Sequence, residues 1–119
     1  MTHDDQAAAY WFRAAATQND PLGMIALGLM HAAGRGVAQD WAAATRWWKR
    51  AAEGNRQPIA TRLLGDAYAC GLGVKRSDPR AVRAFRAAAQ AGDSTASVHL
   101  GHMYANGCAG PDDKVAFEA

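Results

Sequence analysis

The residues best suited to chemistry are two histidines. His99 and His102 stand three positions apart, a spacing that puts two side chains on one face of a helix. Imidazole groups bind Zn²⁺ or transfer protons, but a metal site needs further ligands. No cluster of Cys, Asp or Glu accompanies them in the sequence. We therefore predict no metal, no cofactor and no catalytic residue, unless a pocket brings both histidines to a carboxylate.

Five basic residues recur at the spacing of a structural repeat. Arg13, Lys49 and Arg86 are separated by 36 and 37 residues, and Arg46 and Arg83 stand three positions before the last two. Positions three apart share a helix face, so stacked repeats would align these side chains. We call these five residues the basic ladder. Its guanidinium groups can form paired hydrogen bonds with carboxylates.

The basic ladder predicts a face that binds an acidic segment of another protein. In the first repeat, Tyr10 stands where Arg46 and Arg83 stand in the others, and it adds an aromatic contact of a kind common at interfaces. The predicted partner-binding residues are Tyr10, Arg13, Arg46, Lys49, Arg83 and Arg86. The net charge of +2 is too small to favour nucleic acid. An ordinary solvated face is the alternative interpretation.

Two other patterns resemble ligand-binding motifs but are better explained by helices. The Gly-x-Gly turns that begin at Gly34 and Gly71 lack the strand–GxxxxGK[ST]–helix context of a phosphate loop. Glycine there can adopt the positive φ that a helix end needs. The pairs Trp11–Phe12 and Trp47–Trp48 resemble a platform for stacking bases. Their phase with nearby alanines instead places at least one ring of each pair in the core.

A repeat that fills the chain positions all of these residues. The stretch LGDAYACGLGV at residues 64–74 also occurs as LGLMHAAGRGV at 27–37 and, altered, as LGHMYANGCAG at 100–110. Its second residues, Gly28, Gly65 and Gly101, are 37 and 36 residues apart. A period of this length indicates a stacked helical array.

Each repeat is predicted to contain two helices joined by a turn. Alanine-rich segments with apolar residues at helical spacing predict the first helices, with Asp4, Asp40 and either Ser77 or Asp78 as N-caps. Pro21 suits the first turn of a second helix. The helices are expected over 5–18 and 21–33, from 41 to a turn at 54–58, from about 59 to 70, and on either side of a turn at 91–93.

The segments WFRAAATQND, WWKRAAEGN and AFRAAAQAGD, each followed by a Leu-Gly stretch, resemble the Sel1-like repeat family, which is related to the tetratricopeptide repeats. The resemblance covers residues 4 to about 113. Three positions depart from the pattern: Ala84 replaces an aromatic residue, His31 replaces a tyrosine and Ala109 replaces a glycine.

The resemblance implies an all-α fold, a right-handed α-solenoid of about three helix–turn–helix repeats. The chain is expected to be one domain, residues 1–119, with repeats at 4–39, 40–76 and 77–112 and a partial helix at 113–119.

By the same resemblance, the chain should be a non-enzymatic protein–protein or protein–peptide interaction module that uses its concave first-helix face. A small toxin-inhibitor or immunity-type binding protein is an alternative. A hydrolase related to the cysteine-rich Sel1-like proteins is another, but that group staples each repeat with a regular cysteine pair that is missing here. The last full helix carries Val98, Leu100, Met103 and Tyr104, and we expect this C-terminal end to be closed by the short segment at 115–117, by a second copy or by another partner.

The two cysteines and the N-terminus predict a reduced, cytoplasmic protein. Cys70 and Cys108 fall near the ends of different helices, and a disulfide needs α-carbons within about 7 Å, so both thiols are expected to be free. The polar, acidic start of the chain lacks the pattern of a signal peptide. The longest apolar runs are too short to cross a membrane, so no membrane partner is expected.

Overall fold

The computed structural model describes residues 4–55 and 57–106, and this part of the chain contains six helices and no strand. The helices are α1 (Asp5–Thr17), α2 (Pro21–Ala33), α3 (Trp41–Asn55), α4 (Pro58–Cys70), α5 (Asp78–Gln90) and α6 (Ser94–Asn106). The three predicted helix pairs are therefore confirmed. The partial helix expected at 113–119 lies outside the described residues.

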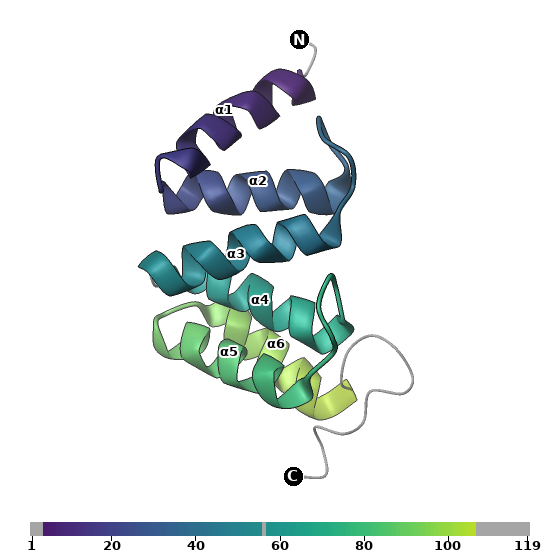
Figure 1. Ribbon diagram of the computed structural model, residues 1–119. Coiled ribbons are helices and arrows are strands. Elements are labelled where there is room, and N and C mark those ends of the chain that lie inside the picture. The colour runs from purple at the N-terminus through teal and green to yellow at the C-terminus, as the bar shows by residue number, and fades with distance from the viewer. Residues whose placement is uncertain (1–3, 56, 107–119) are drawn as a thin grey trace.

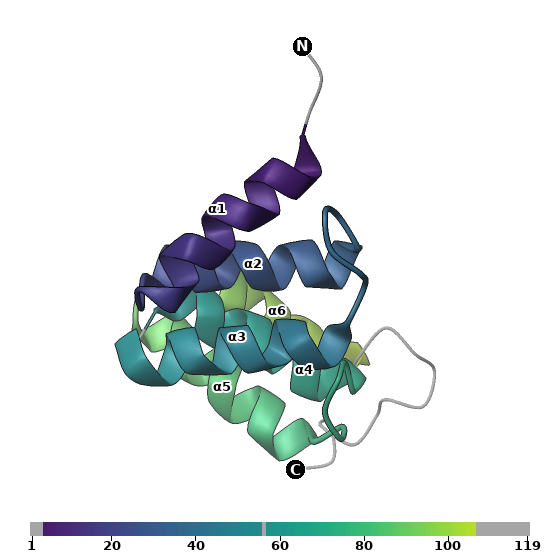
Figure 2. The same cartoon turned by 45° about the horizontal axis from the view of Figure 1, so that its top comes forward.

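The helices stack in chain order (Figure 1). Each one packs against the next, and α4 also contacts α6. Figure 2 shows α3 in front of α4 and α5 in front of α6, so the first helices of the second and third repeats lie on the same side of the stack. This arrangement is an all-α solenoid of helix–turn–helix repeats.

Short polar side chains begin the helices where the sequence predicts them. Asp4 Oδ1 accepts a hydrogen bond from the Ala7 amide at 3.0 Å, and Asp40 Oδ1 accepts one from Ala43 at 3.1 Å. Ser77 caps α5 by accepting from the Arg80 amide. These bonds satisfy amide groups that have no partner inside the helix.

Glycines end the second helices. Gly34 and Gly71 both adopt a φ of 68° at the C-caps of α2 and α4. Gly73, with a φ of 73°, also packs so closely that a Cβ there would lie 2.5 Å from the backbone of Trp41. Both the positive φ and the close approach require glycine. The turns are therefore helix stops, as predicted.

Each repeat contacts the next through an aromatic ring that packs on a glycine. Trp48 of α3 is 2% exposed, donates from Nε1 to the Ile25 carbonyl at 3.3 Å, and covers Gly28 of α2 so closely that a Cβ there would overlap the indole. Phe85 of α5 covers Gly65 of α4 in the same way. The absence of a side chain at both glycines lets the helices approach.

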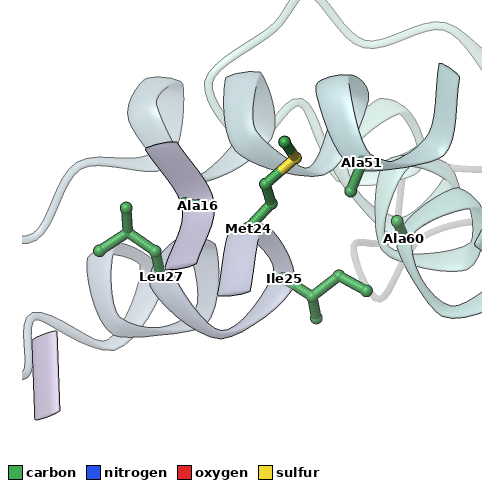
Figure 3. Close-up of a cluster of buried hydrophobic side chains, with 6 residues drawn as sticks. All are labelled: Ala16, Met24, Ile25, Leu27, Ala51 and Ala60. Atoms are coloured by element: carbon green, nitrogen blue, oxygen red, sulfur yellow. The ribbon is translucent and has the colours of Figure 1, made fainter. Parts of the chain in front are cut away.

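A cluster of buried side chains joins the first two repeats (Figure 3). Its members are Ala16, Met24, Ile25, Leu27, Ala51 and Ala60. Phe12 and Trp47 pack against it from α1 and α3, which confirms that one ring of each aromatic pair belongs to the core. The small alanines allow close packing between these helices.

The structure corrects two details of the predicted elements. Trp11 holds the repeat position of Trp47 but is 67% exposed, since α1 is the first of the described helices and none of the others covers that face. Helix α3 continues to Asn55, past the start of the predicted turn, since a glycine near a helix end costs only about 1 kcal/mol. None of the described helices is long and apolar enough to span a membrane.

The expectation of two free thiols is wrong for Cys70, which is disulfide-bonded. Cys108, the other cysteine of the chain, lies outside the described residues. Cys70 is exposed at the last position of α4, so a second thiol can reach its sulfur. Disulfides persist mainly in oxidising compartments.

Candidate protein-interaction surface

The five cations of the basic ladder all lie at the surface. Arg13 belongs to α1, Arg46 and Lys49 to α3, and Arg83 and Arg86 to α5, and each of them is exposed. The buried positions of the same helices, such as Ala16, Trp48 and Phe85, face the core, which leaves the ladder positions on the outer side. Their predicted exposure is therefore confirmed.

An open depression of about 460 Å³ on α3 brings two ladder residues together. Arg46 and Lys49 line it with Arg50 and Glu53. The sequence analysis did not include the last two, although Arg50 stands four positions after Arg46, a spacing that shares a helix face. The depression therefore contains three cations and one carboxylate.

Most ladder cations have no partner among the described residues. Arg13, Arg46, Lys49 and Arg83 make no hydrogen bond or ion pair with the residues at 4–55 and 57–106. Arg86 donates from Nη2 to the Tyr104 hydroxyl at 3.3 Å, and a neutral hydroxyl leaves its charge uncompensated. These charges are available to another molecule.

Four arginines outside the ladder have partners among the described residues. Three form ion pairs: Arg35 with Asp5 at 3.0 Å, Arg62 with Asp93 at 3.0 Å and Arg76 with Asp78 at 3.1 Å. Arg50 donates to Asn19 at 2.9 Å and lies 5.7 Å from the Trp47 ring, so within the α3 depression the unengaged cations are Arg46 and Lys49. Lys75, outside the ladder, is exposed and unpaired within the described residues.

Tyr10 forms an exposed aromatic pair with Trp11. The two rings meet edge to face, with centroids 5.0 Å apart and planes at 87°, and Tyr10 is 63% exposed. Tyr10 precedes Arg13 by one helical turn on α1. This placement agrees with the aromatic contact that the sequence predicts at the edge of the basic ladder.

The two histidines do not form a pair. His99 Nδ1 lies 2.9 Å from Asp66 Oδ1, linking α6 to α4, and the Phe85 ring packs edge to face against the imidazole at 5.5 Å. His102 is exposed. Burial raises the pKa of Asp66, although His99 and Arg62 oppose this shift. Among the described residues, no group of three His, Cys, Asp or Glu side chains could hold a metal ion.

The chain is similar to several solved structures. It is 36% identical to a Sel1 repeat protein from Oxalobacter formigenes, with a TM-score of 0.75, covering 82% of this chain and 73% of that one. It is 32% identical to c5321, a protective antigen with an SLR fold in uropathogenic Escherichia coli, with a TM-score of 0.79. That match covers 92% of this chain but only 23% of the antigen.

A more distant structure has the same fold. Cysteine-rich protein B of Helicobacter pylori is 24% identical, with a TM-score of 0.75, and the match covers 82% of this chain and 73% of that one. A comparison with curated proteins found no match.

The family model for the Sel1 repeat matches residues 1–20, 21–55 and 58–93. These segments include the aromatic and alanine positions of α1, α3 and α5 as well as the Leu-Gly stretches of α2 and α4. With its stacked helix pairs and its glycine-ended second helices, the chain belongs to the Sel1 repeat family.

Proposed function

We propose that this chain is a non-enzymatic interaction module that binds an acidic segment of another protein along the basic ladder. Sel1 repeat proteins are in general protein-interaction modules, which supports the coarse function. The observation that carries the finer proposal is that Arg13, Arg46, Lys49 and Arg83 are exposed and unpaired within the described residues.

The α3 depression is the proposed centre of this surface. Arg46 and Lys49 line it without an internal partner, so carboxylates of the partner can bind them without breaking an existing bond. Glu53 borders the same depression and disfavours a carboxylate on its side. Arg13 and Tyr10 on α1, and Arg83 and Arg86 on α5, extend the surface to the neighbouring repeats. A toxin-inhibitor or immunity-type role would be one specific form of this binding.

A role without catalysis agrees with the position of the histidine–carboxylate pair. His99 and Asp66 bridge two helices, and Phe85 packs against the imidazole, so this pair fits the role of a structural link. The alternative of a hydrolase has no specific observation in its favour.

The state of Cys70 supports a proposal about the cellular compartment. The cytoplasmic location expected from the sequence requires a reduced thiol, whereas the disulfide at Cys70 favours an oxidising compartment. We propose an oxidising compartment. To test this, cells of the host are quenched with an alkylating reagent, and the mass of the protein is measured with and without prior reduction. A disulfide at Cys70 predicts that alkylation adds mass only after reduction.

A defined acidic probe tests the binding surface. We expect a fluorescent glutamate-rich peptide to bind the full chain in an anisotropy titration at low salt, and to dissociate as salt is raised, because exposed charges are screened over about 10 Å at 0.1 M salt. The triple variant Arg46→Glu, Lys49→Glu, Arg83→Glu should weaken binding at least tenfold, mainly through a slower association rate.

A matched pair of lysines provides the control. Lys49→Glu and Lys75→Glu change the net charge equally, and both side chains are exposed and unpaired within the described residues. We expect only Lys49→Glu to weaken binding clearly. Equal effects of the two variants would show that the peptide senses net charge alone and would contradict the proposed surface.

A further inference from the structure

The contact between repeats, an aromatic ring packed on a glycine, is made at two of the three corresponding glycines and is absent at the third. Gly28 of α2 is buried by Trp48, and Gly65 of α4 is buried by Phe85. Gly101 of α6 occupies the same repeat position, but it is exposed and no described residue lies within 4 Å of a Cβ built there. Among the described residues, the surface of α6 around Gly101 is therefore an open site for an aromatic ring, which we call the Gly101 socket.

Val98, one helical turn before Gly101, is also uncovered. Val98 is 55% exposed, whereas Ile25, its counterpart on α2, is 7% exposed beneath α3. The carbonyl of Ile25 also accepts the indole hydrogen bond from Trp48. The Gly101 socket thus resembles the surface of α2 without the Trp48 ring. The residue that fits it best is an aromatic residue on the first helix of a repeat.

The other half of the same contact is open at the opposite end of the stack, on α1. Phe12 holds the repeat position of Trp48 and Phe85 and is only half-buried. Trp11 holds the position of Trp47. Trp47 packs against the buried cluster that joins the first two repeats, whereas Trp11 is 67% exposed. Helix α1 therefore presents an aromatic face of the kind that α3 and α5 bury against the preceding repeat.

We propose that a second copy of this chain occupies the Gly101 socket, with its α1 packed against α6 as α3 packs against α2 and α5 against α4. The Phe12 ring of that copy covers Gly101, and its Trp11 lies beside it. A second copy would continue two existing interfaces. The contact between an aromatic face and a glycine is already made twice within the chain, and the chain also carries an unpaired aromatic face on α1 and an unpaired glycine surface on α6. The proposal is independent of the basic ladder.

The proposed contact is head to tail, since it joins two different surfaces. Such a contact leaves one free surface at each end of a dimer, so association continues into longer assemblies or closes into a ring. The weight-average mass should therefore rise steadily with protein concentration. A face-to-face contact between identical surfaces would stop at a dimer.

Sedimentation velocity over a hundredfold concentration range tests the contact with three single variants. Gly101→Leu fills the socket, Trp11→Ala removes the exposed ring, and Thr95→Leu is the control. Thr95 is exposed on α6, and its counterpart Leu22 on α2 is 64% exposed, so a leucine is accommodated there outside the contact. We expect wild type and Thr95→Leu to associate, and the other two variants to stay monomeric with unchanged helical circular dichroism.

Mixing the two monomeric variants gives the decisive result. Gly101→Leu retains α1, and Trp11→Ala retains the socket, so an equimolar mixture should form a heterodimer and nothing larger. A mixture that stays monomeric overturns the head-to-tail contact. A wild-type protein that is monomeric at every concentration overturns the second copy as the occupant.

Discussion

At the scale of single residues, glycines decide how closely neighbouring repeats approach. Gly65 and Gly101 hold the same repeat position, but a Cβ at Gly65 would lie 2.5 Å from the Phe85 ring, whereas Gly101 has no described neighbour within 4 Å. The same substitution should therefore have opposite effects at the two positions. Both substitutions share the intrinsic helix preference of alanine over glycine, so the difference between their effects on stability reports the contact between repeats.

We predict that Gly65→Ala lowers the free energy of unfolding by roughly 1–3 kcal/mol, because a buried ring must move to admit the methyl group. Gly101→Ala should instead raise it by about 0.5–1 kcal/mol, because alanine loses less backbone entropy than glycine in a helix. Urea denaturation of both variants measures the difference. A destabilising Gly101→Ala in dilute, monomeric protein would show that the C-terminal face is already filled.

The repeat register predicts the exposure of the basic ladder, since it depends only on which helix face carries the alanines. Other residue properties depend on contacts that the register does not specify. Glu53 and Arg50 enter the α3 depression, and Arg50 is engaged by Asn19, a residue from another repeat. The disulfide at Cys70 requires a second thiol close to it in the folded chain. The positions of the cysteines near helix ends do not show which thiols come close together.

At the scale of helices, the start of α6 depends on Asp93. Its Oδ1 accepts hydrogen bonds from the Thr95 and Ala96 amides, and its Oδ2 accepts one from Arg62 of α4 at 3.0 Å. Burial alone would raise the pKa of Asp93, but the Arg62 and backbone donors lower it below its usual value of 3.8. One side chain therefore caps a helix and ties it to the preceding repeat.

We predict that Asp93→Ala costs about 1–2 kcal/mol of unfolding free energy, within the range for a lost N-cap. Asp93→Asn should cost less, since asparagine also caps helices but does not form an ion pair with Arg62. Thermal denaturation at neutral pH compares the two. Equal losses would mean that the ion pair, not the cap, makes the contribution.

The pH dependence of the stabilisation by Asp93 follows from the direction of its pKa shift. Because the pKa of Asp93 is lowered in the folded state, its stabilisation is present above 3.8 and is lost as the pH falls through the lowered value. The pKa of Asp66 is shifted upward, so its effect has the opposite sign. The stability gap between wild type and Asp93→Asn should thus be constant from pH 7 to about 5 and should narrow in strong acid.

Helix boundaries are largely local and are therefore visible in the sequence. Asp4, Pro21 and Ser77 occupy the predicted cap and first-turn positions, because capping requires only a short polar side chain or a missing amide hydrogen beside the first turn. The sequence predicts a turn from Gly54, but α3 continues to Asn55. A glycine ends a helix only when its φ turns positive, and sequence alone does not give that angle.

At the scale of the whole molecule, each repeat is stabilised mainly by its neighbours. The period of 36 or 37 residues predicts this stacking, and the helix contacts confirm it, since each helix packs chiefly on the next. The exposure of Trp11 could not follow from the pattern, because α1 carries the same sequence signals as α3 but is the first of the described helices in the stack. Position within the array, rather than local sequence, determines what these aromatic residues contact.

Trp48 is the main link between the first repeat and the rest of the solenoid, since its buried ring packs on Gly28 and bonds to Ile25. We predict that Trp48→Ala lowers the free energy of unfolding by about 3–5 kcal/mol, the usual cost of removing a large buried ring. The loss should be uneven, because repeat arrays are stabilised by contacts between nearest neighbours. Amide hydrogen exchange followed by mass spectrometry should show α1 and α2 losing most protection, while α5 and α6 retain more.

Trp11→Ala is the matched control for this experiment. It removes the same side chain from a neighbouring first helix, but Trp11 is 67% exposed, so the stability of dilute, monomeric protein should change by no more than about 0.5 kcal/mol. An equal loss of protection in all six helices of Trp48→Ala would contradict the prediction, because the stack would then unfold as one cooperative unit. Uneven protection would instead show that the aromatic ring on Gly28 carries the coupling between the first repeat and the second.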